Sequence, residues 1–412
     1  MDTRREFLKT AMLLSGAAGM ATLPPSILKA LSIDPDLGTT FLDAEHVVLL
    51  MQENRSFDHT FGTLRGVRGF NDPRAMTLPD LNKVWLQQSA NGETYAPFRF
   101  DIKDTKITWM GSLPHTRESQ MGARNNGRQD NWIEAKKADD EKYAHMPLTM
   151  GYYTREDIPF YYALADAFTV CDQNFCSSLT PTDPNRLYFF SGTVRAAHDE
   201  NSRAFIDNGS VERGVEWRTF PELLEQHNIS WKVYQNEISI DGGFTVEEDE
   251  WLSNFGDNSL EYFNQYNVKL SKRYVDYLPI RIAKLEQELK DAEAKLPSLV
   301  AGSKELKEAQ EQLKAGKELL VSKKEDEQKF TREKFDSLSS YHKTIHEKAF
   351  EVNAADPDQH ELMPLQYSDD TTERKINIPK GDVLHKFRED VENGKLPTVS
   401  WLVAPETFSD HP

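Results

Sequence analysis

The apolar positions of the chain fall into short runs and into one longer segment with a helical repeat. The run at 47–51 is unbroken and begins with two β-branched residues, so it predicts a buried strand. Residues 229–235 alternate between polar and apolar, and another apolar run lies within 396–406, so both segments also predict strands. Between these runs, the pattern predicts a helix over 160–166 followed by a strand over 167–171. This mixture of short strands and helices predicts an α/β fold.

The helical repeat occupies the region between residues 280 and 350. Apolar residues recur there at heptad-like spacing among lysines and glutamates, and a segment at 297–302 with proline and glycine interrupts the repeat. Two helical blocks joined by such a break predict an antiparallel hairpin inserted into a larger domain. We favour a hairpin that packs on itself, with a role in partner binding as the alternative.

The first residues combine positive charge with a short apolar segment. Arg4 and Arg5 precede a weakly apolar segment at 10–23 that is rich in small residues. This pattern is typical of a twin-arginine export signal, and the segment is too short to span a bilayer. A basic amphipathic N-terminus is the simpler alternative. No other segment approaches membrane-spanning length, so we expect the twin-arginine machinery to deliver a mature chain without a transmembrane anchor to the periplasm or medium.

The charge balance limits the classes of partner. The 67 acidic residues outnumber the 49 basic residues, which gives a formal net charge of −18. A protein that binds nucleic acid or an anionic membrane needs a basic face, so this balance argues against both functions. An anionic substrate would have to be attracted by local cations or by a metal ion.

The chain has two cysteines, Cys171 and Cys176. An oxidising compartment would permit a disulfide between them, but so short a loop would remove little entropy from the unfolded chain. Buried unpaired thiols are an equally good interpretation. Two cysteines without local histidines are a poor basis for a metal site.

Candidate metal ligands follow the first predicted strand. Glu53 and Asn54 come directly after the apolar run at 47–51. Ligands of open α/β sheets bind beyond the carboxyl ends of the strands, and carboxylate and amide oxygens suit a hard cation. An ordinary polar loop is the alternative, and Ser56 is expected to begin a short helix there.

A second candidate group lies where Pro184 predicts the start of a helix. Thr182 or Asp183 could cap that helix. A hydroxyl at a helix N-terminus also faces free backbone N–H groups and the positive end of the helix dipole, which together hold phosphate. From spacing alone, an N-cap role for Thr182 is the simpler interpretation.

Four ordered motifs bear a resemblance to a known family. They read QENRSFDHTFG at 52–62, MGYYTREDIPF at 150–160, PTDPNR at 181–186 and APETFSDHP at 404–412. Together they resemble the bacterial phosphoesterase family that includes non-haemolytic phospholipases C and acid phosphatases. The resemblance implies an alkaline-phosphatase-like α/β/α sandwich with a mainly parallel sheet, and a phosphoric ester hydrolase activity.

The resemblance also implies roles for single residues. The metal ligands would be Glu53, Asn54 and Thr182, and Thr182 would also be the nucleophile, with Thr180 as the less favoured neighbour. Phosphate contacts would come from His115 and from Asn125, for which Asn126 is the alternative. His411 would contact the phosphoryl group and act as general acid. Arg186 could reach the phosphate, although a structural salt bridge is the commoner fate of such an arginine. Phe175 stands where many relatives carry a histidine.

The function implied is phospholipase C activity on phosphatidylcholine-like diesters through a phospho-threonine at Thr182, assisted by a divalent metal ion of unknown identity. One alternative is an acid phosphatase that hydrolyses phosphomonoesters. The other alternative is that the chain is a truncated, non-catalytic fragment. Relatives carry a further acidic pair that completes the metal site, and this sequence ends before it, so we expect a weakly active N-terminal portion of a longer enzyme. The expected organisation is a signal peptide and linker at 1–30, a catalytic domain at 40–275 that continues at 351–412, and the hairpin at 276–350.

Overall fold

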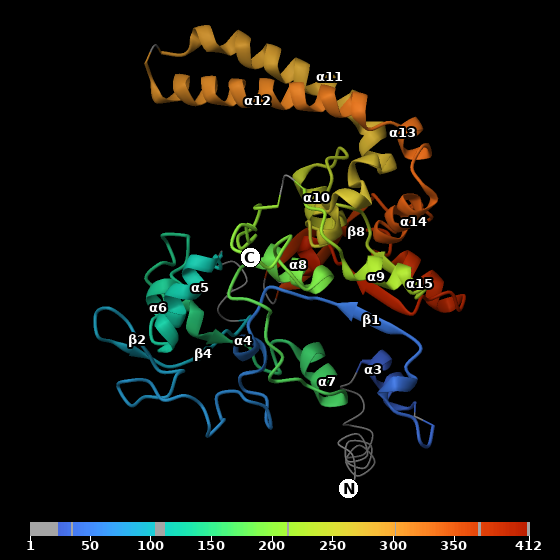
Figure 1. The fold of residues 1–412 in the computed structure, drawn as a ribbon. Coiled ribbons are helices and arrows are strands. Elements are labelled where there is room, and N and C mark those ends of the chain that lie inside the picture. The colour runs from blue at the N-terminus through green and yellow to red at the C-terminus, as the bar shows by residue number, and fades with distance from the viewer. Residues whose placement is uncertain are drawn as a thin grey trace.

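The computed structural model describes residues 24–33, 36–103, 112–211, 214–300, 302–369 and 372–409. Its main sheet is parallel and has the strand order β1–β9–β6 (Figure 1). The strands are β1 (Val47–Leu50), β6 (Trp231–Tyr234) and β9 (Val399–Leu402). Segments far apart in the sequence therefore meet side by side, and their carboxyl ends share one edge. The structure confirms the predicted α/β fold with a parallel sheet.

The main hydrophobic core packs against this sheet. Its helices are α8 (Thr182–Ser191), α9 (Phe220–Gln226) and α14 (Ser340–Ala349). Trp231, Trp401 and Phe190 are almost completely buried, and the rings of Phe190 and Trp401 stack with centroids 5.6 Å apart. This packing fixes α8 against the sheet, so the first residue of α8 has a defined position relative to the strand ends.

Two strand predictions need correction. The run at 47–51 forms β1, but Val47, Val48 and Leu50 are 45%, 42% and 54% exposed, so the prediction of a buried strand was wrong. The reason is that β1 is an edge strand of the described sheet and only Leu49 packs against the core. The predicted strand over 167–171 was also wrong. Helix α7 (Pro159–Ala167) extends to Ala167, and no described strand pairs with the irregular chain that follows it, so the apolar residues there have no ladder to join.

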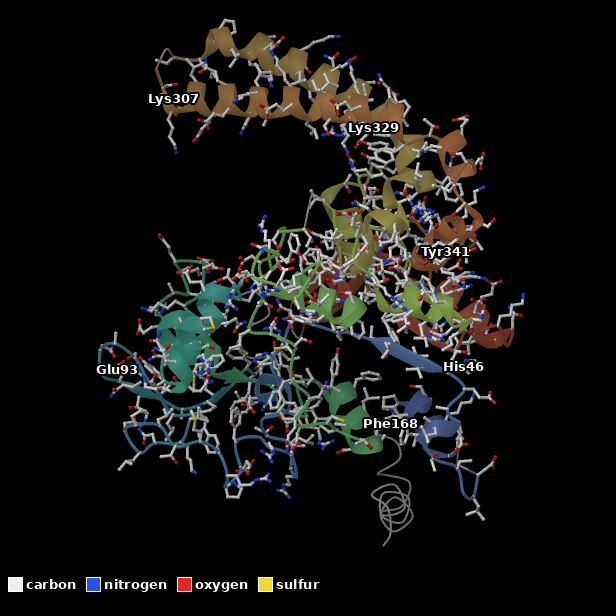
Figure 2. The ribbon with its side chains drawn as sticks, viewed as in Figure 1. His46, Glu93, Phe168, Lys307, Lys329 and Tyr341 are labelled. Atoms are coloured by element: carbon white, nitrogen blue, oxygen red, sulfur yellow. The ribbon has the colours of Figure 1, made fainter. Side chains whose placement is uncertain are left out.

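The helical repeat forms the predicted antiparallel hairpin. It consists of α11 (Lys272–Lys295), the short turn η8 (Leu296–Ser298) and α12 (Lys304–Lys329), which lie side by side and project from the body (Figure 1). Gly316 permits their close approach, since a Cβ there would lie 2.8 Å from Leu289 Cδ2. Figure 2 shows Lys307 near the free end and Lys329 near the body. The chain then returns to the core through α13 (Arg332–Asp336) and α14. The domain boundaries stay predictions.

A smaller lobe, visible in blue to green beside the sheet, contains the segments between β1 and α8 (Figure 1). It has its own core around Phe100, Leu148 and Tyr153. Gly151 is required at the centre of this core, because a Cβ there would lie 1.9 Å from the Phe100 ring. The elements of this lobe are α4 (Phe57–Phe61), β2 (Gln87–Gln88), β3 (Thr94–Tyr95), β4 (Phe98–Arg99), α5 (Arg117–Arg124), η3 (Asn125–Gly127), α6 (Trp132–Ala135), η4 (Leu148–Met150), β5 (Gly151–Tyr152) and α7.

The remaining elements complete the fold. They are α3 (Pro25–Leu31), η1 (Phe41–Asp43), α10 (Val246–Leu252), η5 (Ser259–Tyr262), η6 (Asn264–Tyr266), η7 (Val268–Leu270), β7 (Leu362–Asp369), β8 (Thr372–Pro379), α15 (His385–Glu392) and η9 (Glu406–Phe408). Among them, η5 and η6 contribute Leu260 and Tyr266 to the main core. In the part of the chain that the structure describes, no helix is both long and apolar enough to cross a membrane. Arg4 and Arg5 lie outside the described residues, so the export signal stays a prediction.

A buried carboxylate fastens the small lobe. Asp157 accepts hydrogen bonds from Arg99 Nε and Nη2, both at 3.0 Å, and from the backbone N–H and hydroxyl of Thr154, both at 2.7 Å. Burial opposes its ionisation, but these hydrogen bonds outweigh burial and lower the pKa of Asp157 to about 2. The stabilisation is therefore present above the ordinary pKa of 3.8 and is lost as the pH falls toward 2.

We expect Asp157→Asn to lower the free energy of unfolding by about 1–3 kcal/mol at pH 7, because it removes a charged acceptor of several hydrogen bonds. The deficit should shrink when urea titrations are repeated at pH 3. Glu156→Gln is the matched control, since the Glu156 side chain is 78% exposed on the same arginine, and it should change stability by less than about 0.5 kcal/mol. An Asp157→Asn deficit that does not change with pH would contradict this assignment.

Candidate active site

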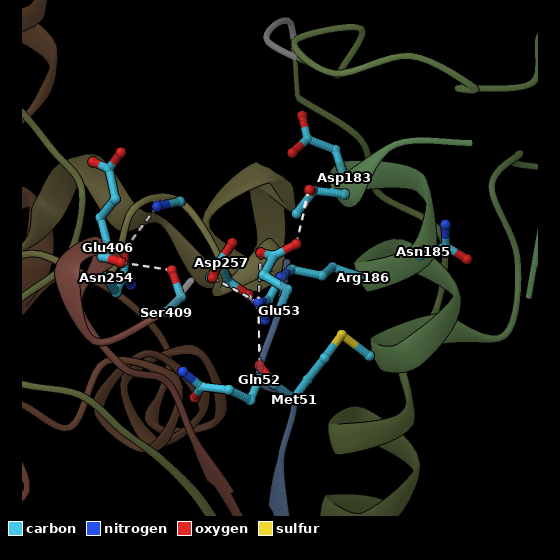
Figure 3. A network of polar contacts seen from close by, with 12 residues as sticks. Met51, Gln52, Glu53, Asp183, Asn185, Arg186, Asn254, Asp257, Glu406 and Ser409 are labelled. Carbon is cyan, nitrogen blue, oxygen red and sulfur yellow. Dashed lines mark hydrogen bonds and ion pairs between the residues drawn. The ribbon is translucent and has the colours of Figure 1, made fainter. Parts of the chain in front are cut away.

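Glu53 and Thr182 meet at the carboxyl edge of the sheet. Glu53 follows β1, and its Oε2 accepts a hydrogen bond of 2.9 Å from the hydroxyl of Thr182, which is 129 residues away in the sequence. Its Oε1 accepts a hydrogen bond of 2.9 Å from Arg186 Nη2 (Figure 3). The neighbouring Gln52 donates to the carbonyl oxygen of Phe408, which ties the end of β1 to the segment after β9. The structure therefore brings Glu53, a predicted metal ligand, into direct contact with Thr182, the predicted nucleophile.

The helix that carries Thr182 begins differently from the capping prediction. Thr182 is the first residue of α8, Pro181 occupies the N-cap position, and no side chain caps the helix. The prediction that Thr182 or Asp183 caps α8 was wrong, because the Thr182 hydroxyl donates to Glu53 and the Asp183 carboxylate accepts from the Gly209 N–H at 2.8 Å. The hydroxyl is thus directed toward a carboxylate rather than toward its own helix.

The loop before α8 is braced by the Asn185 side chain. Its amide nitrogen donates to the carbonyl oxygens of Ser178, Thr180 and Pro181, and its amide oxygen accepts from the Ser178 N–H at 3.1 Å. Asn185 therefore connects the loop to the first turn of α8. These contacts hold the backbone on the N-terminal side of Thr182, so the hydroxyl has little freedom to move.

Arg186 links the parts of this edge. It is 3% exposed and pairs with Glu53 and, at 2.6 Å, with Oδ2 of Asp257 (Figure 3). It also donates to the carbonyl oxygens of Asp257 at 3.2 Å and Met51 at 3.3 Å. The structural salt bridge considered for Arg186 is present. Its contact with phosphate stays a prediction, since its charge already faces two carboxylates.

The two carboxylates on Arg186 have opposite pKa shifts. Burial raises the pKa of Asp257 to about 9, and the nearby Glu53 charge adds to burial while Arg186 opposes both. Burial also acts to raise the pKa of Glu53, but the charge and hydrogen bond of Arg186 outweigh it, so that pKa lies below its usual range. Glu53 is therefore the ionised member at neutral pH.

A cavity of about 800 Å³ opens beside Thr182. Its lining brings together most of the predicted site residues, namely Glu53, Asn54, His115, Thr180, Thr182 and Arg186. The ring Nδ1 of His115 lies 3.0 Å from the Leu113 carbonyl oxygen. A carbonyl can only accept, so Nδ1 carries a proton in this contact and Nε2 remains for a ligand.

One predicted phosphate-binding residue is not in this lining. Asn125 ends α5 in a left-handed conformation, and its amide donates to Asp130 Oδ1 at 2.7 Å. Neither Asn125 nor Asn126 lines the cavity, so a phosphate contact from either stays a prediction. His411 lies outside the described residues.

The sequence interpretation missed three residues of this region. Asp257 lies in a polar segment to which no role was assigned, His59 lies in the first motif, and no sequence pattern distinguishes Lys136 from other lysines. His59 lines the cavity with its Nδ1 2.8 Å from the Gly151 carbonyl oxygen and its ring against Tyr153. Lys136 also lines the cavity although it is only 7% exposed.

Both cysteines are free and exposed, so buried thiols were the wrong expectation, and the structure holds no disulfide between them. Cys176 lines the cavity, and its thiol donates to the Ser178 carbonyl oxygen at 3.3 Å.

The donor chemistry of the edge suits part of a hard-cation site. Glu53 and Thr182 present oxygen atoms that converge, and Asn54 lines the same cavity. Hard cations such as Ca²⁺ or Mg²⁺ take about six or more oxygen ligands. Among the described residues, no group of three His, Cys, Asp or Glu side chains could share a metal ion. Glu53, Asn54 and Thr182 could therefore supply some, but not all, of the oxygen ligands of such a cation.

Comparison with known proteins gives one consistent relationship. The family model described as the Phosphoesterase family matches residues 44–301 and 337–412. The interval between the matched segments contains α12 and α13, which include the second helix of the hairpin.

Several characterised proteins are similar to this chain. It is 43% identical over 270 residues to a non-hemolytic phospholipase C of Burkholderia pseudomallei, which covers 64% of this chain and 37% of that protein. It is 42% identical over 239 residues to a hemolytic phospholipase C of Pseudomonas aeruginosa, covering 56% and 31%. It is 39% identical over 258 residues to phospholipase C B of Mycobacterium tuberculosis, covering 58% and 47%. The chain spans less than half the length of these relatives.

We expect Arg186→Met to lower the free energy of unfolding by about 3–5 kcal/mol, because it leaves the ionised Glu53 carboxylate buried without its cation. The double variant Arg186→Met/Glu53→Gln should recover part of this loss, since it removes the charge that has lost its partner. Arg155→Met is the matched control, because Arg155 pairs with Asp166 at the surface, and it should change stability by less than about 1 kcal/mol. Equal effects of Arg186→Met and Arg155→Met in urea denaturation would show that the buried bridge is unimportant.

Proposed function

The chain belongs to the phosphoesterase family, and from this premise we propose that the cavity binds a phosphate ester whose phosphorus is attacked by Thr182. The observation that carries the proposal is the hydrogen bond between the Thr182 hydroxyl and Glu53, at the cavity and at the N-terminus of α8. Thr182 stands in the PTDPNR motif, and its hydroxyl is neither capping the helix nor buried in the core. The Glu53 carboxylate determines the position of the Thr182 hydroxyl.

The reaction proceeds in two displacements. The Thr182 oxygen forms a bond to phosphorus as its proton passes to Glu53 Oε2, and the bond from phosphorus to the alcohol oxygen breaks. The leaving oxygen takes a proton from solvent water. A water molecule then attacks phosphorus and gives one proton to solvent, the bond to Thr182 breaks, and the Thr182 oxygen takes back the proton from Glu53, which releases the phosphate product and restores the hydroxyl. Glu53 orients the hydroxyl, and the first turn of α8 offers its positive dipole end to the phosphoryl oxygens.

Other residues of the cavity have roles in binding. His115 in its imidazolium form donates Nε2–H to a phosphoryl oxygen, while its Nδ1–H is donated to the Leu113 carbonyl oxygen. Glu53, Asn54 and Thr182 would hold a divalent cation together with further ligands. When bound, such an ion lowers the pKa of the attacking hydroxyl and balances the charge on the phosphoryl group. Asn125 and His411 are proposed as further phosphoryl contacts on the resemblance of their motifs.

The substrate class follows from the relatives. All three of the similar proteins described above are called phospholipases C, so we propose a phospholipid phosphodiester as the substrate. Phosphate monoesters are the alternative substrate class. The two classes are separated by comparing phosphocholine release from phosphatidylcholine with p-nitrophenol release from p-nitrophenyl phosphate.

We expect Thr182→Ala to reduce phosphocholine release by about 10³-fold or more, because it removes the attacking oxygen. Thr182→Ser keeps a hydroxyl and should retain measurable turnover. Thr180→Ala is the neighbouring control and should retain most activity. Chelation of divalent cations should lower turnover of the unmodified protein, and added metal should restore it. Turnover of Thr182→Ala at the unmodified rate would exclude Thr182 as the nucleophile.

A further inference from the structure

Lys136 is a buried cation in the wall of the candidate active site. It follows α6, is 7% exposed and lines the same cavity as Thr182 and His115. Its Nζ donates to the Pro114 carbonyl oxygen at 2.8 Å and to the Ser119 hydroxyl at 3.1 Å. An ammonium group has three N–H donors, so these two neutral acceptors leave one donor for another partner.

The described surroundings of Lys136 do not balance its charge. None of the carboxylates in the described parts of the chain forms an ion pair with it, and both of its hydrogen-bond acceptors are neutral, whereas buried lysines are usually paired with an acid. Burial without such a partner lowers the pKa of Lys136 to about 8, so the ammonium form still dominates at neutral pH. A buried charge of this kind is unfavourable for the empty protein and becomes favourable when an anion binds beside it.

The other buried cation of the cavity is already neutralised. Arg186 contacts Glu53 and Asp257, and the ionised Glu53 carboxylate balances its charge. The whole chain has a formal charge of −18, which repels an anionic substrate. A phosphate ester therefore needs a local positive charge, and Lys136 supplies one inside the cavity.

We propose that Lys136 is an anion-binding residue of this cavity, which donates its remaining N–H to an anionic oxygen of a bound phosphate group. The inference rests on the proposed function for its substrate class, and it adds the residue that recognises the anion. The contacts of Lys136 also suggest a competing role, because its bond to the Pro114 carbonyl oxygen fixes the backbone immediately before His115. In that case the side chain would act by holding the His115 turn.

Binding of inorganic phosphate at pH 7 distinguishes the two roles, because it needs no turnover. Isothermal titration calorimetry should show that Lys136→Met raises the Kd for phosphate about tenfold or more, while Lys136→Arg, which keeps the charge, stays closer to the unmodified protein. Ser119→Ala removes a bracing partner and keeps the ammonium, so it should change the Kd by less than about threefold. A folded Lys136→Met protein with an unchanged Kd, or an equal loss in Ser119→Ala, would overturn the inference.

A second measurement uses the unmodified protein and so does not depend on the folding of a variant. Acetic anhydride labelling followed by mass spectrometry should show that inorganic phosphate protects Lys136 but not Lys137, whose side chain is 52% exposed and pairs with Glu134. Equal labelling of Lys136 with and without phosphate would overturn the inference. Thr182→Ala separates this result from the proposed function, since it should abolish turnover and leave the protection of Lys136 intact. If turnover survives in Thr182→Ala while protection persists, the proposed nucleophile is wrong and the anion site stands.

Discussion

One guanidinium group holds the edge of the sheet together. Arg186 lies on α8, and its contacts reach Glu53 after β1 and Asp257 in a loop that follows α10. Buried ions are tolerated only when hydrogen bonds compensate for the lost water, and Arg186 donates to two carboxylates and two carbonyl oxygens. The geometry at Thr182 depends on this arrangement, because the carboxylate that orients the hydroxyl is itself oriented by Arg186.

This constraint explains why the strand ends and α8 act as one unit. The core behind α8 contains Phe190 and Trp401, which fix the helix axis against the sheet. The polar contacts in front of it then fix the rotation of its first turn. Packing alone would place Thr182 near the edge, and the ionic contacts determine which way its hydroxyl points.

The sequence predicted the features that depend on local pattern. The helical hairpin follows from its apolar repeat, whereas the parallel sheet and the meeting of Glu53 with Thr182 were implied by the resemblance of the four motifs to the phosphoesterase family. The exposure of β1 could not be predicted, because it depends on strand order, which no single strand encodes. The irregular chain after α7 has the same cause, since an apolar run becomes a strand only beside a partner strand.

The features of the site that escaped prediction arise from contacts between distant segments. Lys136 directly follows the four-residue helix α6. It is buried because α6 packs closely on α5, where a Cβ at Gly122 would lie 3.3 Å from Ala135 Cβ. Asp257 belongs to a polar segment whose burial is set by Arg186. Neither environment produces a periodic pattern of apolar and polar residues in the sequence.

The hairpin has a mechanical consequence that its composition does not suggest. Helix α11 has 24 residues, so it is about 36 Å long, and near the body Tyr274 donates to Asp326 of α12. Such an arm amplifies rotation, since a tilt of roughly 5° at its root displaces the far tip by about 3 Å. Pro279 lies inside α11 and removes one backbone hydrogen bond near that root, which makes this the natural place for the arm to bend.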